Sequence, residues 1–131
     1  MYRFLLVAMV ITLSGCASSS TTPIAQDTFK VEANTAPICG AAGAQKIALQ
    51  QAAVETIRRG YDRFVVVDDK QNAYRMYTNI AGFTPSAHGN ELVVKMFREG
   101  DRAAVNSLSA RQTLGPNWQE LASKNVMNCL D

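Results

Sequence analysis

The sequence is poor in the residues that most catalytic and metal sites use. It has one histidine, one tryptophan and three cysteines among 131 residues. With His88 as the one histidine, the usual base for a serine or cysteine nucleophile is nearly absent, and a metal ion would lack a second imidazole ligand. We therefore expect no enzyme, no metal site and no cofactor. A hydrolase or transferase would instead need His88 to meet carboxylates in a cleft, and the candidates are Asp62, Asp68 and Asp69.

An excess of charge of one sign is also lacking. Charged residues make up 18% of the chain, and the formal net charge is +2. Arg3 belongs to an apolar leader, so the rest of the chain has 12 Lys and Arg against 11 Asp and Glu. No basic cluster interleaved with aromatic residues occurs, which excludes nucleic acid as a partner. The apolar run of residues 4–13 is too short for a transmembrane helix, which needs about 20 residues.

Residues 1–15 have the layout of a secretory signal peptide, with Arg3 ahead of the apolar run and small residues behind it. The stretch Leu13-Ser14-Gly15-Cys16 resembles the bacterial lipobox at all of its positions. The resemblance implies cleavage before Cys16, a diacylglycerol on its sulfur, and usually a third acyl chain such as palmitate on the new amino terminus. The alternative is an ordinary signal peptide with an incidental cysteine.

The lipobox also implies a location. Ala17, rather than Asp, follows Cys16, and in lipoproteins of Gram-negative bacteria this implies export to the outer membrane. Two or three acyl chains, at about 0.8 kcal/mol per buried CH₂, make a stable anchor. We expect the membrane to hold the chain through Cys16 with the domain in the periplasm; display on the cell surface stays open.

Assigning Cys16 to lipid leaves Cys39 and Cys129 as an even pair in an oxidising compartment. We therefore predict a disulfide between them. It would close a loop of about 90 residues and stabilise the domain by about 4 to 5 kcal/mol. Two free thiols or an intermolecular bond are the alternatives.

The chain after the lipobox divides into a tether and one domain. Residues 16–37 are rich in Ser, Thr, Ala, Asn and Pro, and this composition predicts a flexible, lipidated tether. Phe29 and Val31 alternate with Lys30 and Glu32, which leaves open a short edge strand within it. Residues 38–131 are then a single small domain.

The domain reads as an α+β fold. An Ala-rich run predicts a helix over 41–59 that ends at Gly60. Strands are expected at 64–67, with both faces covered, at 73–78 and at 92–97, with a turn at Asp68-Asp69 and a loop over 80–90. Two more helices are expected, one from Asp101 to about residue 111 and one after Asn117. The expected architecture is a small, mainly antiparallel sheet of three to four strands packed with about three helices.

Aromatic residues mark the candidate binding surface: Tyr61, Tyr74, Tyr77 and Trp118. Such residues anchor many interfaces. Core packing in a small domain is the competing interpretation of the same four positions. A pocket lined by Tyr74, Met76 or Tyr77 would instead favour a periplasmic module that binds a small ligand.

Three segments carry a further resemblance: residues 60–67, residues 92–97 followed by Gly100-Asp101, and residues 114–120. Together they resemble a group of small proteobacterial envelope lipoproteins of unassigned function over residues 39–129. The helix followed by a valine strand also resembles the Rcs-type envelope-stress sensor lipoprotein, whose pattern has two disulfides where this chain can form one. The resemblance implies an envelope lipoprotein and supplies no catalytic residues. We expect a non-catalytic role in envelope assembly, structure or stress sensing, with another envelope protein as the partner.

Overall fold

The computed structural model describes residues 17–36, 39–75 and 86–124. Along the chain the elements are β1 (Ala17–Ala25), β2 (Thr28–Thr35), α1 (Gly40–Arg58), β3 (Arg63–Arg75), β4 (Ser86–Phe97), the 3₁₀ helix η2 (Arg102–Ala104), β5 (Leu108–Ser109), α2 (Ala110–Leu114) and α3 (Trp118–Lys124). The strands form one antiparallel sheet in the order β1-β2-β4-β3-β5. The predicted α+β class is confirmed, with five strands in the described residues rather than three to four.

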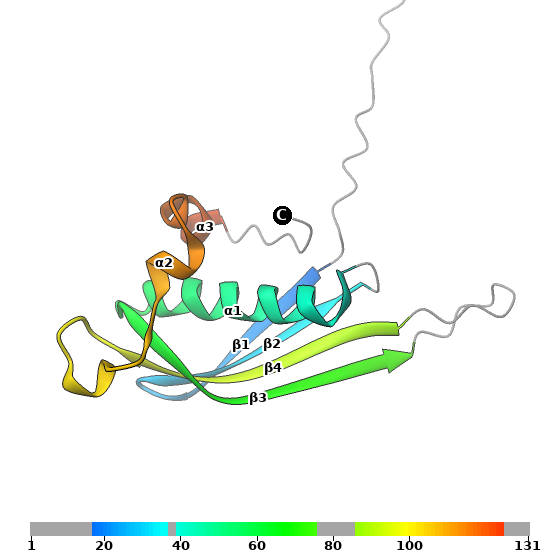
Figure 1. Cartoon of the computed structure of the whole chain (residues 1–131), viewed down its shortest axis with the longest axis horizontal. Helices are drawn as coiled ribbons and strands as arrows, with labels where there is room; N and C mark the ends of the chain where they lie inside the picture. Colours follow the sequence, from blue (N-terminus) through cyan, green and yellow to red (C-terminus); the bar gives the residue numbers. More distant parts are fainter. Residues whose placement is uncertain (1–16, 37–38, 76–85, 125–131) are drawn as a thin grey trace, which may run out of the picture.

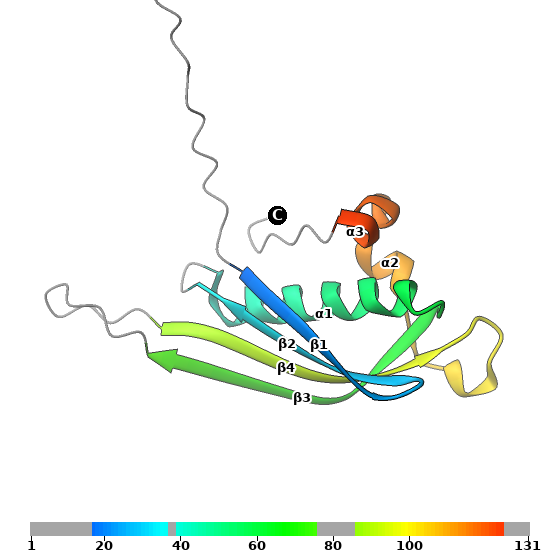
Figure 2. The same cartoon turned by 180° about the vertical axis from the view of Figure 1, so that it is seen from behind.

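One helix covers one face of the sheet. In Figure 1, α1 lies along the sheet, and α2 and α3 lie on the side of α1 that faces away from it. Figure 2, from behind, shows the same layering, with β1 as the outer strand. Among residues 17–36, 39–75 and 86–124, no helix lies on the opposite face of the sheet in either view.

The core lies between α1 and the sheet. Strand residues alternate between the two faces, and those on the helix side are buried: Phe29, Val31 and Ala33 of β2, Phe64 of β3, and Leu92, Val94 and Met96 of β4. The helix contributes Ile47, Ala48, Ala52 and Val54. Small alanines let the helix approach the sheet closely. The predicted shared face of Leu92, Val94 and Met96 is confirmed.

The first helix is confirmed within one residue at each end. Its end is a Schellman motif, because the N–H of Gly60 donates to the Ile57 carbonyl and the N–H of Tyr61 to the Thr56 carbonyl, both at 3.0 Å. Gly60 has φ 83°, a backbone conformation that a residue with a Cβ adopts only with strain. The chain is thereby turned directly into β3.

The prediction of a flexible tether is wrong for residues 17–35, which form the hairpin of β1 and β2. The sequence argument relied on the small number of large apolar side chains. β1 needs few of them, because its backbone pairs with β2 along the strand and its Ser19 hydroxyl donates to Gln51 Oε1 of α1 at 3.2 Å. The sheet therefore includes residues 17–35, ahead of the domain start predicted at residue 38, and β2 is an inner strand rather than an edge strand.

The turn predicted at Asp68-Asp69 is also wrong, because β3 continues through both residues to Arg75. A β-bulge takes the place of the turn: Val66 pairs with Val94, Asp68 pairs with Val93, and Val67 is the extra residue. Val67 is 56% exposed, so the prediction that both faces of this strand are covered is wrong as well. The strand predicted at 73–78 is a continuation of β3 as far as Arg75, and its remainder lies outside the described residues.

Two boundaries in the second half need correction. Residues 86–90 belong to β4 rather than to the predicted loop, whose earlier part lies outside the described residues. The helix predicted from Asp101 to 111 stops as the short η2, because Asn106 turns the chain at φ 66° and β5 follows. The capping role of Asp101 is confirmed, since its Oδ1 accepts from the N–H of Ala103 at 3.0 Å. The last helix is confirmed as α3.

Candidate functional site

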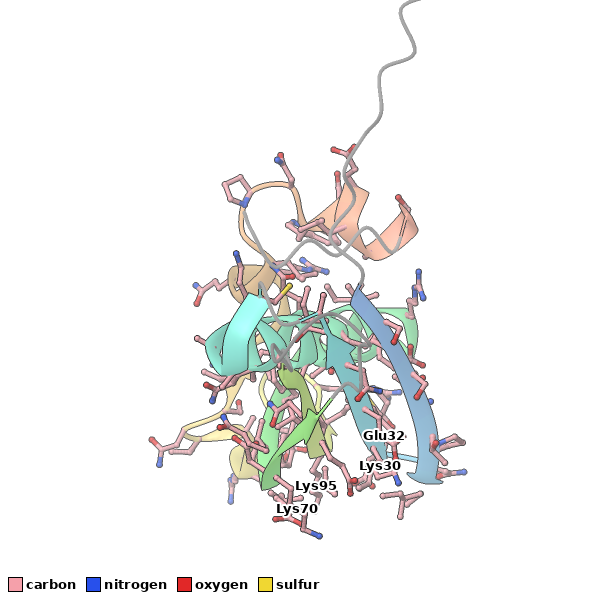
Figure 3. The ribbon with its side chains drawn as sticks, turned by 90° about the vertical axis from the view of Figure 1, so that its right-hand side faces the viewer. Lys30, Glu32, Lys70 and Lys95 are labelled. Atoms are coloured by element: carbon pink, nitrogen blue, oxygen red, sulfur yellow. The ribbon has the colours of Figure 1, made fainter. Side chains whose placement is uncertain are left out.

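The face of the sheet opposite α1, called here the open face, carries a lattice of polar and charged side chains. The register of the strands identifies the residues whose side chains point away from the helix layer. They are Ser18, Ser20 and Thr22 of β1, Thr28, Lys30, Glu32 and Asn34 of β2, Glu91, Val93 and Lys95 of β4, and Val65, Asp68 and Lys70 of β3. Figure 3 labels Lys30, Glu32, Lys70 and Lys95, which lie in the part of the molecule away from α1.

The open face carries charges of both signs on neighbouring positions. In one row across the strands, Glu32 lies opposite Glu91, which lies opposite Lys70. Lys30 Nζ is 2.7 Å from Glu32 Oε1, and Lys70 Nζ is 3.5 Å from Asp68 Oδ2. Two carboxylates facing each other across strands repel, so the lysines on either side offset the repulsion between Glu32 and Glu91.

The negative charges on the open face change the pKa of Lys30. The pKa of its ammonium group is raised above the ordinary value of 10.5 by the hydrogen bond to the Glu32 carboxylate, and further by the negative charges of Glu32 and Glu91. Lys30 is therefore a cation at every physiological pH. In the adjacent row it lies opposite the half-buried Val93, which Asp68 flanks on the other side. An apolar centre between paired charges suits contact with a polar protein surface.

A second feature is a surface pocket of about 360 Å³ at the end of the sheet where β4 finishes. Two acids and two bases meet there with two aromatic rings: Asp27, Asp101, Lys95, Arg98, Tyr61 and Phe97. The Arg98 guanidinium lies 5.0 Å from the centre of the Tyr61 ring, within the range of a cation–π contact. Lys95 belongs to both this pocket and the open face.

The four aromatic residues predicted as a binding surface are placed as follows. Tyr61 is half-buried against the core beside Arg98, and Trp118 is half-buried with Arg111 at 4.6 Å from its ring centre. Tyr74 lies in β3 opposite Ala87, and Tyr77 lies outside the described residues. Tyr61 and Trp118 thus have different neighbours, and the four-residue surface stays a prediction.

The cysteines are only partly described. Cys39 is the residue before α1 and is disulfide-bonded. Its predicted partner Cys129 and the predicted lipidation site Cys16 both lie outside the described residues. The pairing of Cys39 with Cys129 therefore stays a prediction.

The acid residues and the histidine that a hydrolase would need are spread along the sheet. His88 lies opposite Ala73, whereas Asp68 and Asp69 lie opposite Val93 and Leu92. Asp69 and Ala73 are four positions apart along β3, which is about 13 Å. Asp62 lies before β3 and accepts a hydrogen bond from the Glu99 N–H at 3.0 Å. This register does not bring the four residues together.

Among residues 17–36, 39–75 and 86–124, no group of three or more His, Cys, Asp or Glu side chains could hold a metal ion. In the same part of the chain, no helix has the length and apolar character needed to cross a membrane.

Sequence reasoning did not single out the charges of the open face. The signal was present, because charged Lys30 and Glu32 alternate with apolar Phe29, Val31 and Ala33. An alternation of this kind predicts a strand with one wet face. The residues before Phe29 have a composition typical of disordered segments, and that composition favoured the prediction of a tether instead. Comparison with known proteins gives no match to a family model, a curated protein or a solved structure.

Proposed function

We propose that this chain is an outer-membrane lipoprotein that binds another envelope protein through the open face and has no catalytic activity. The proposed anchor is a diacylglycerol on Cys16, with the domain in the periplasm. The lipobox Leu13-Ser14-Gly15-Cys16 and the following Ala17 support the anchor and the destination.

The observation that carries the binding role is the sheet face on which none of the described helices packs. An antiparallel sheet with a helix packed on one face can have its other face exposed to solvent. Polar residues are sufficient on such a solvent-exposed face. Here the polar residues form the ion pairs Lys30–Glu32 on β2 and Lys70–Asp68 on β3, on either side of Val93. Complementary charges on a partner would set the register of the contact and its rate of formation.

A second candidate is a small-ligand module, which the 360 Å³ pocket favours. Arg98 and Lys95 would contact an anionic group, and Asp27 and Asp101 a cationic one, beside the Tyr61 ring. A small zwitterion has this combination of charges. Its binding would depend on Arg98 and not on Lys70, which is on the open face but does not line the pocket.

Photocrosslinking in intact cells tests the proposed function. Benzoylphenylalanine is placed at Lys70 or at Glu32 on the open face, and at exposed Gln119 of α3 as the matched control. We expect a discrete adduct from the two open-face positions and none from Gln119, and mass spectrometry then identifies the partner. Equal adducts from all three positions, or none from Lys70 and Glu32, would rule out the open face as the binding surface.

A further inference from the structure

We infer that the domain sits directly on the bilayer, with one end of the sheet in the lipid headgroup layer. This inference rests on the proposed anchor at Cys16. The end concerned, called here the anchor end, is the first row of residues across four strands: Ala17, Thr35, His88 and Ala73. The occupant proposed for this end is the phospholipid surface itself.

The first observation that supports this orientation is the short length of chain between the anchor and the sheet. β1 begins at Ala17, the residue that follows Cys16. One residue of extended chain spans about 3.4 Å. The headgroup layer is about 5 to 8 Å thick on each side of a bilayer. A lipid on Cys16 therefore leaves no spacer, and the anchor end is held within or against the headgroups.

The distribution of charge along the sheet is independent evidence for the same orientation. The three rows nearest to Cys16 contain no Asp, Glu, Lys or Arg. Across β1, β2, β4 and β3 these rows are Ala17, Thr35, His88 and Ala73; Ser18, Asn34, Gly89 and Asn72; and Ser19, Ala33, Asn90 and Gln71. Charges first occur in the fourth row, at Glu32, Glu91 and Lys70.

Uncharged residues are what a headgroup layer tolerates. A carboxylate placed there would lose water and would be repelled by anionic lipids, whereas hydroxyl and amide groups can hydrogen-bond to headgroups. The helix starts at the same end of the sheet (Figure 1), and its first turn has no acid. Beyond the uncharged rows, β3 ends at Arg75, and the first charge of α1 is Lys46. Both are cations, which anionic headgroups attract.

The opposite end of the sheet has the contrasting composition. Acids and bases crowd the turns there: Asp27, Asp62, Arg98, Glu99, Asp101 and Arg102. β1 has nine residues, so this charged end stands about 30 Å from the lipid. The open face then runs away from the membrane, where an envelope partner would approach it from the side.

Tryptophan quenching in vesicles tests the orientation. The full-length lipoprotein is extracted from membranes and reconstituted in vesicles of phosphatidylethanolamine and phosphatidylglycerol that include a lipid with a nitroxide on its headgroup. Trp118→Phe removes the native fluorophore, and one tryptophan is returned by Ser18→Trp or Ile24→Trp. Both positions are exposed on β1, and they lie six positions, or about 20 Å, apart. Circular dichroism checks that each variant folds.

We expect the nitroxide to quench Ser18→Trp several-fold more strongly than Ile24→Trp. Asn34→Trp, which lies opposite Ser18 on β2, should behave like Ser18→Trp and replaces it should that variant not fold. Equal quenching at the two ends, or stronger quenching of Ile24→Trp, overturns the orientation and leaves the anchor intact. Fatty-acid labelling of the same preparations tests the anchor separately, because a wild-type chain without label, like Cys16→Ser, overturns both proposals.

Discussion

Lys30 and Glu32 form the closest ion pair on the open face, with 2.7 Å between Nζ and Oε1. They are two residues apart on β2, so both side chains point to the same side of the sheet. Glu91 of β4 lies directly opposite Glu32 and adds a second negative charge near the same ammonium group. The pair is therefore part of a cross-strand cluster rather than an isolated surface contact.

The first prediction concerns the titration of Lys30. Its pKa is raised in the folded protein, so the folded state holds the proton more tightly than the unfolded chain. The stabilisation is fully present below the ordinary pKa of 10.5 and is lost as the pH rises through the folded-state value. NMR titration of the Lys30 side chain should give a midpoint above 10.5, and Glu32→Gln should lower it. A midpoint that Glu32→Gln leaves unchanged would mean that this carboxylate does not hold the proton.

The second prediction concerns the core beneath α1. Phe29 has 0% exposure, and the Arg59 guanidinium lies 5.1 Å from its ring centre. Phe29→Ala should lower the free energy of unfolding by about 3 to 5 kcal/mol, because it leaves a cavity. Val105 is 74% exposed, so Val105→Ala is the control and should change it by less than about 0.5 kcal/mol. Urea denaturation measures both; similar losses would mean that Phe29 does not pack as described.

The third prediction concerns the link between β3 and the loop after η2. Arg63 donates from Nε to the Ser107 hydroxyl oxygen at 2.8 Å and from Nη2 to the Ser107 carbonyl at 2.7 Å. The same hydroxyl donates to the Ala104 carbonyl. Ser107→Ala should cost about 1 to 3 kcal/mol of unfolding free energy, because Arg63 and Ala104 each lose a partner.

Ser123 is the matched control for this change. Its hydroxyl donates to the Glu120 carbonyl in an exposed, local contact. Ser123→Ala should therefore alter the unfolding free energy by less than about 0.5 kcal/mol. Equal values for the two variants would show that the Arg63 link contributes nothing measurable.

The fourth prediction concerns the hairpin of β1 and β2. In an antiparallel edge strand, alternate N–H groups donate to the neighbouring strand and the others face solvent. Hydrogen exchange followed by NMR should therefore find slow and fast amides alternating over residues 18–22 of the folded protein. Uniformly fast exchange over these residues would restore the flexible tether that the composition suggested.

Much of the fold could be predicted from local sequence signals. The period of the Ala-rich run and Gly60 placed α1, and the alternation of Leu92, Val94 and Met96 placed the buried face of β4. Local signals failed where pairing with a distant strand decides the outcome. β1 is a strand because β2 pairs with it, and Asp68-Asp69 stays in β3 because the bulge at Val67 keeps the strand in register with β4.

The candidate site was less predictable than the fold. The open face brings together Lys30 and Glu32 of β2, Glu91 and Lys95 of β4, and Lys70 of β3. Which of these residues face one another depends on strand order and register, and neither can be deduced from one segment alone. The lipobox, by contrast, is a contiguous motif that needs no tertiary structure to be identified.

Intact mass spectrometry of the protein extracted from membranes is the most direct test of the anchor on which this account depends. We predict a mature chain that begins at Cys16, with the added mass of a diacylglyceryl group and a further acyl chain at its amino terminus. Digestion should place the added mass on the peptide that contains Cys16 and continues into β1. A chain that begins elsewhere, or an unmodified Cys16, would contradict the account.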